Sequence, residues 1–95
     1  GKPFKFEISQ NYPNPSNPVS KIDYQLPFDA KVSLKVYNLT GQEVSVLVDG
    51  NINAGYHTAD FDGTNLSSGV YFYKISASGN NGESYTKTMK LVLVK

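Results

Sequence analysis

The 95-residue sequence contains no cysteine, which excludes disulfide bonds and cysteine-based metal sites. All nine basic residues are lysines, so the sequence lacks the planar guanidinium group that favours bidentate recognition of phosphate and bases. A formal net charge of +1 provides no field that would attract nucleic acid or an anionic membrane. No apolar run approaches the ~18 residues that a membrane-spanning helix needs. We therefore expect neither nucleic-acid binding nor membrane insertion.

The groups that catalysis or metal binding would need are also scarce. The single histidine, His57, shares one face of a predicted strand with Ala59 and Phe61, which favours a partly buried, hydrogen-bonded structural role. No serine lies in a nucleophile-elbow context such as G-x-S-x-G. The stretch 60–65 offers oxygen ligands but lacks the EF-hand spacing, so we favour an Asp-Gly turn over half of a calcium loop. We predict no enzymatic activity, no cofactor and no metal site.

Apolar and polar residues alternate with a period of two through most of the chain. Val32, Leu34 and Val36 alternate with polar residues, for example, and no segment has the i, i+3, i+4 stripe of a helix. Turn signals separate the alternating segments at intervals of about 8 to 12 residues. We predict an all-β fold, a seven-stranded immunoglobulin-like antiparallel β-sandwich, as a single domain over residues 1–95. The predicted strands are 4–10, 20–26, 30–38, 43–48, 56–61, 69–77 and 83–94.

Three prolines and three asparagines crowd the stretch NYPNPSNP at 11–18, here called the connector. Each proline fixes its own φ and restricts the residue before it to extended geometry, while asparagine side chains can satisfy nearby backbone groups. We predict that the connector is rigid, pairs with no strand and carries the chain from one sheet to the other. The residues of this structural motif are Tyr12, Pro13, Asn14, Pro15, Asn17 and Pro18.

A second structural motif lies in the segment SGVYFY at 68–73. Gly69, Tyr71 and Tyr73 have a spacing similar to the G-x-Y-x-C run of immunoglobulin domains, with Tyr73 in place of the cysteine. This resemblance implies a tyrosine corner, in which the Tyr71 hydroxyl bonds upstream backbone; a binding role for Tyr71 is the alternative.

Three further aromatic residues fall on strand faces opposite the predicted core. They are Tyr37, Tyr56 and Phe72. One interpretation is a platform for sugar stacking or for docking a neighbouring domain. The other is that they are separate surface residues or cover a strand edge.

An ordered set of motifs resembles a known family. NYPNPSNP is similar to that family's N-Y-P-N-P-F-N-P, and KLVLVK at 90–95 is similar to its terminal K-M-V-L-L-K. The chain thereby resembles the type A C-terminal sorting domains of type IX secretion, the Por secretion system C-terminal sorting domain family. The immunoglobulin-like domain of the flagellar hook-capping protein shares several of the motifs. The intervening matches are VSLKVYNLTGQEV at 32–44, AGYH at 54–57, FDG at 61–63 and LSSGVYFY at 66–73.

The resemblance implies a domain at the C-terminus of an exported protein. The two ends of the sequence lead to the same expectation of a C-terminal piece of a longer protein, because the chain lacks an initiator methionine and closes on a strand-like run. The implied partner is a covalently fused N-terminal cargo, such as a secreted hydrolase, that enters the periplasm of a Gram-negative bacterium. The outer-membrane translocon would then recognise the domain, and a sortase-like peptidase would cleave it as the cargo reaches the cell surface or the medium. The implied recognition residues are Lys90, Leu91, Val92, Leu93, Val94 and Lys95.

Ser16 departs from the family pattern, which has Phe at this position. That Phe would fill an apolar pocket at the end of the sandwich, so its loss would cost stability or remove a recognition feature unless Phe4, Phe6 or Phe28 fills the gap. An alternative function is a carbohydrate- or protein-binding accessory module of a secreted hydrolase, and a structural role in a hook-cap assembly is a third. The position in the parent chain distinguishes these functions, because a sorting domain must end that chain.

Overall fold

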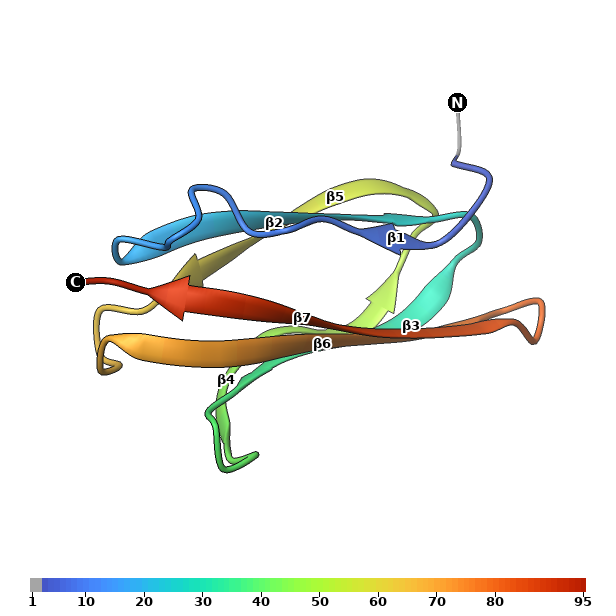
Figure 1. Ribbon diagram of the computed structural model, residues 1–95. Helices are drawn as coiled ribbons and strands as arrows, with labels where there is room; N and C mark the ends of the chain where they lie inside the picture. Colours follow the sequence, from blue (N-terminus) through green and yellow to red (C-terminus); the bar gives the residue numbers. More distant parts are fainter. Residues whose placement is uncertain (1–2) are drawn as a thin grey trace.

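The computed structural model describes residues 3–95 and contains seven strands (Figure 1). The strands are β1 (Glu7–Ile8), β2 (Val19–Leu26), β3 (Ala30–Tyr37), β4 (Glu43–Ile52), β5 (Gly55–Asp62), β6 (Gly69–Gly79) and β7 (Ser84–Leu93). Their inward positions are rich in β-branched and aromatic residues, which suit a half-buried pleated surface. Among the described residues there is no helix that is long and apolar enough to cross a membrane.

Two antiparallel sheets stack as the two layers of Figure 1. One sheet has the order β1-β2-β5 and the other has the order β4-β3-β6-β7. The prediction of an all-β, seven-stranded antiparallel sandwich is confirmed. β4 pairs with β3, whereas the fourth strand of a constant-type immunoglobulin domain joins the sheet of the first, second and fifth strands. The narrower immunoglobulin-like arrangement therefore stays a prediction.

The core fills the space between the sheets with aliphatic and aromatic side chains. Tyr73 and Phe61 are its largest fully buried members. Burial of one large apolar side chain contributes roughly 1.5–3 kcal/mol, and with no disulfide this packing must hold the fold. The fully buried apolar residues are Ile22, Leu26, Val32, Leu34, Val36, Phe61, Tyr73, Ile75, Leu91 and Leu93.

Strand boundaries differ from the predictions chiefly at β1 and β4. The alternation predicts a strand over 4–10, but β1 has only two residues, because residues 4–5 form a bend and Phe4 is fully exposed. β4 runs to Ile52, beyond the predicted end at residue 48, because its pairing with β3 continues through Gly50. Residues 49–51, which lie outside the predicted strands, are therefore inside β4. The other five strands agree with the predicted bounds to within about two residues.

The connector does not cross between the sheets. It joins β1 to β2, which are antiparallel neighbours in one sheet. It also pairs with two strands, because Tyr12 forms an antiparallel bridge with Lys21 and Ser16 forms a parallel bridge with Leu93. The prediction of a non-pairing crossover is therefore wrong. Proline lacks an N–H, but the neighbouring Tyr12 and Ser16 keep theirs and donate them to strand carbonyls.

Candidate recognition surface

The tail, residues 90–95, alternates between the core and the outer surface of the larger sheet. Its inward residues Leu91 and Leu93 are 0% and 1% exposed. Because these two leucines are fixed in the core, the side chains that alternate with them along the strand point outward in defined positions. The outward residues are Lys90, Val92 and Val94.

The last residue is bound to the loop between β5 and β6. The Lys95 backbone N–H donates to Ser68 Oγ at 3.1 Å, and its ammonium group donates to the Thr64 carbonyl at 2.6 Å. The second bond is charge-assisted and therefore stronger than a neutral one. The tail thus stays attached to the body of the domain up to Lys95.

The connector lies along the tail on the side away from β6 (Figure 1). Ser16 N–H donates to the Val92 carbonyl and Val94 N–H donates to the Ser16 carbonyl, both at 2.8 Å. The Gln10 side-chain amide donates to the Lys90 carbonyl at 2.7 Å. These bonds occupy backbone groups at the edge of β7 that would otherwise be open to another chain.

Two buried polar residues, Asn11 and Ser16, anchor the connector. The Asn11 amide donates to the Pro13 carbonyl at 3.1 Å, and the Ser16 hydroxyl donates to the Pro18 carbonyl at 2.7 Å. Sequence reasoning missed Asn11, because asparagine is usually exposed. The motif residues other than Pro18 are exposed, namely Tyr12, Pro13, Asn14, Pro15 and Asn17.

No phenylalanine takes the place that the family pattern gives to Phe at position 16. Phe4 is fully exposed and Phe28 is 38% exposed. Phe6 stacks on Tyr85 with ring centroids 5.5 Å apart, at the opposite end of β7 from the Ser16 bridge. Ser16 itself is 0% exposed, so it fits the site with its hydroxyl group bonded.

Tyr71→Phe is expected to lower the free energy of unfolding by about 1 kcal/mol. The Tyr71 hydroxyl donates to the Ser67 carbonyl, four residues upstream, at 2.6 Å, which is the bond that a tyrosine corner requires. Urea unfolding measures the change. Tyr56→Phe is the matched control, because Tyr56 is 68% exposed. A Tyr71→Phe midpoint equal to that of the parent chain would contradict the corner assignment.

Tyr73 ties the N-terminal segment to the larger sheet. Its hydroxyl accepts from the Asn11 backbone N–H at 2.9 Å and donates to the Ser9 carbonyl at 2.7 Å. Burial raises the pKa of Tyr73 to about 12, although the Asn11 N–H acts in the opposite direction. These partners lie more than 60 residues away in sequence.

The Tyr73 pKa predicts a loss of stability at alkaline pH. Below pH 10 the Tyr73 hydroxyl keeps its proton in both the folded and the unfolded state. Between pH 10 and about 12 it loses the proton in the unfolded chain but keeps it in the folded chain. Stability should therefore fall in this window, by about 1.4 kcal/mol per pH unit for one proton. Urea unfolding at several pH values should show a flatter decline for Tyr73→Phe than for Tyr24→Phe. Parallel declines in the two variants would refute this origin of the effect.

His57 and the acidic residues near it have structural partners. His57 Nε2 lies 2.7 Å from the Asn53 carbonyl, and its ring stacks on Tyr24 with centroids 5.3 Å apart. Asp60 pairs with Lys21 at 2.8 Å, and the Asp62 carboxylate accepts from Thr64. Those bonds to Thr64 lower the pKa of Asp62. Within residues 3–95 no three His, Cys, Asp or Glu side chains gather as metal ligands would.

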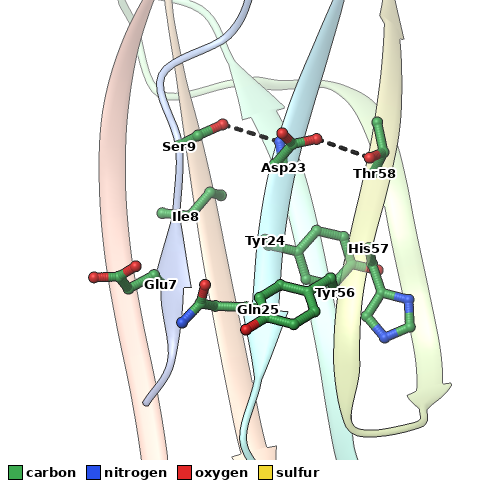
Figure 2. A pocket seen from close by; sticks show the side chains of 9 residues that line it. All are labelled: Glu7, Ile8, Ser9, Asp23, Tyr24, Gln25, Tyr56, His57 and Thr58. Carbon is green, nitrogen blue, oxygen red and sulfur yellow. Dashed lines mark hydrogen bonds between the residues drawn. The ribbon is translucent and has the colours of Figure 1, made fainter. Parts of the chain in front are cut away.

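A shallow depression of about 290 Å³ lies on the smaller sheet (Figure 2). Asp23 lies at one end of the depression, where its carboxylate accepts from Thr58 Oγ1 at 2.7 Å and its N–H donates to Ser9 Oγ at 2.9 Å. Figure 2 shows Tyr56 beside Gln25, its cross-strand partner, toward the other end of the depression from Asp23 and Thr58. The lining contains carboxylates, hydroxyls, the Gln25 amide and the His57 imidazole, and His57 Nε2 is bonded to the Asn53 carbonyl rather than to a hydroxyl.

The three outer aromatic residues do not form one platform. Tyr37 and Phe72 are direct cross-strand partners on the larger sheet. Tyr56 lies on β5, in the other sheet. A sugar-stacking surface made of all three is therefore impossible, and the accessory-module alternative loses that support.

Among residues 3–95 the sandwich has no helix, and the connector and the tail lie side by side at the β7 edge of the larger sheet. The family model for the secretion system C-terminal sorting domain matches residues 10–93, and the chain belongs to this family. It is therefore a C-terminal sorting signal for type IX secretion, in a family of signals rather than of enzymes. Such a signal belongs to an exported protein, secreted or at the cell surface.

A solved structure shares the fold. CopC from Methylosinus trichosporium OB3b superposes with a TM-score of 0.57 over 94% of this chain and 93% of that one, at 13% sequence identity. At this identity the similarity concerns the fold alone. A search of curated protein sequences finds no match.

Proposed function

We propose that the chain directs a covalently fused cargo, such as a secreted hydrolase, from the periplasm of a Gram-negative bacterium to the cell surface or the medium. The outer-membrane translocon recognises the folded domain, and a sortase-like peptidase separates it from the cargo. One observation supports a folded signal above all: Leu91 and Leu93 fix the tail in the core, so Lys90, Val92 and Val94 are presented in defined positions.

A fixed tail is suited to this task because recognition of a preorganised surface costs less conformational entropy than recognition of a flexible peptide. The tail is restrained by β6 on one side, by Ser16 on the other and by the two bonds of Lys95 at its end. A receptor would therefore meet the same arrangement of these side chains whatever cargo is fused to the domain.

The test is export of a periplasmic reporter that carries residues 1–95 at its C-terminus. We expect reporter activity on the cells or in the medium of a strain with the type IX system. The same strain without a functional translocon should keep the reporter in the periplasm. A reporter that stays in the periplasm of the intact strain, although the domain is folded, would favour the accessory-module alternative.

A further inference from the structure

The outward residues of the tail continue into a larger apolar surface. Phe72 of β6 lies between Lys90 of the tail and Tyr37 of β3, as their direct cross-strand partner. Val70 is paired with Val92 in the same way. All these side chains point away from the core. We name this surface the Phe72 face and define it as Tyr37, Leu39, Val70, Phe72 and Val92.

Leu39 extends the Phe72 face at one end. It is 70% exposed, and it sits in a turn that the Asn38 side chain fixes by accepting from the N–H groups of Thr40 and Gln42 at 3.1 and 2.9 Å. Leu39 and Val70 both line a hollow of about 270 Å³. Leu39 therefore adds to a contiguous exposed apolar patch with aromatic members, and such patches mark sites of protein contact.

Charge is divided between the two sheets. The strands of the larger sheet carry five lysines against Glu43 and Asp49, whereas those of the smaller sheet carry four acidic residues against Lys21. Within residues 3–95, Lys35 forms an ion pair with Glu43, but Lys74 and Lys90 form none. These two lysines border the Phe72 face, so the chemistry that complements it is apolar with acidic groups at the rim.

We infer that the Phe72 face docks a protein partner that presents an apolar patch rimmed by carboxylates, in the same recognition event as the tail. The inference rests on the proposed function and adds residues outside the tail to the contact. Continuity favours one partner, because Val92 belongs to both surfaces and Lys90 borders the face. An anionic membrane is a weaker match, since electrostatic lipid binding uses clusters of roughly four to eight basic residues, and among residues 3–95 the unpaired lysines that border this face are Lys74 and Lys90.

Export of the reporter fusion tests the inference with two matched pairs of variants. Phe72→Thr removes the central aromatic side chain but keeps a residue that favours strands, and Tyr56→Thr makes the same change on the opposite sheet. Lys74→Glu reverses a charge beside the Phe72 face, and Lys31→Glu does so at the far end of β3. Loss of a central contact should lower the exported fraction about tenfold or more for Phe72→Thr and Lys74→Glu. Tyr56→Thr and Lys31→Glu should be exported like the parent chain.

Folding is controlled by urea unfolding of each variant domain. Because Phe72 is half-buried, Leu39→Ser serves as a second variant in an exposed turn, where the fold has little to lose. Parent-like export of Phe72→Thr, Leu39→Ser and Lys74→Glu would overturn the inference and leave the proposed function standing. If the parent fusion itself is not exported, both the inference and the proposed function are contradicted. Binding of the domain to vesicles of anionic lipid that is lost in Phe72→Thr would assign the Phe72 face to a membrane and also overturn it.

Discussion

Deleting residues 91–95 from the reporter fusion is expected to abolish export, so that the reporter accumulates in the periplasm. The deletion removes the outward side chains Val92 and Val94 and Lys95, which we propose as recognition residues on the family resemblance. Export is measured as the fraction of reporter activity in the medium and on intact cells. The intact fusion in the same strain gives the reference value.

The deletion alone does not separate recognition from folding. It also removes Leu91 and Leu93 from the core. The truncation of one buried leucine lowers the free energy of unfolding by about 2–5 kcal/mol. The double variant Val92→Ser, Val94→Ser changes only outward side chains and should still lose export by about tenfold or more. Its matched control is Thr86→Ser, Thr88→Ser, two exposed positions on the same strand outside the tail. Parent-like export of a well-folded valine variant would show that the exposed side chains of the tail are not recognised.

Period-two alternation was sufficient to predict the sandwich, because a strand that buries one face must alternate. It fails where the side chains alternate but the backbone has no partner, as at Phe4, or where a Gly that favours turns is paired inside a strand, as at Gly50. Alternation reports which face a side chain occupies. It carries no information on how far the neighbouring strand extends.

The connector was misjudged for a related reason. Proline restricts local φ and removes one donor, and both effects can be predicted from the sequence. The sheet that the next strand joins depends instead on pairing partners that are distant in sequence, such as Leu93 for Ser16. The two hydrogen bonds of the Tyr73 hydroxyl to Ser9 and Asn11 are equally long-range. No local pattern predicts them.

The resemblance to the family points to the tail as a candidate for recognition, whereas nothing in the sequence points to the Phe72 face. Alternation places Phe72 and Tyr37 outside the core without showing that they are cross-strand neighbours. That relation depends on the register between β3 and β6, which a one-residue shift would destroy. Tyr56 is also an aromatic residue at an outward strand position, but it lies on the opposite sheet.

The F-D-G motif at 61–63 meets the tail at one glycine. A Cβ added to Gly63 would lie 2.7 and 2.8 Å from the two Cδ atoms of Leu93, and 3.1 Å from Phe61 Cε2. Leu93 and Phe61 are 1% and 0% exposed, so neither side chain has free space to move into. Gly63 N–H also donates to the Pro18 carbonyl at 3.0 Å. The glycine therefore allows the end of β5, the connector and the tail to pack together.

Gly63→Ala is accordingly expected to cost about 1–3 kcal/mol through overpacking, and Leu93→Ala about 2–5 kcal/mol through the cavity it leaves. In the double variant the added methyl group occupies part of the space vacated by Leu93. Its loss of stability should therefore be smaller than the sum of the two single losses, by about 0.5–3 kcal/mol. Urea unfolding of the four proteins measures this difference. Gly63→Ala combined with Ile75→Ala is the control, because Ile75 lies six residues along β6 from Gly69, the partner of Leu93, and the two losses should add. Additivity of Gly63→Ala with Leu93→Ala as well would show that the motif does not support the tail through this contact.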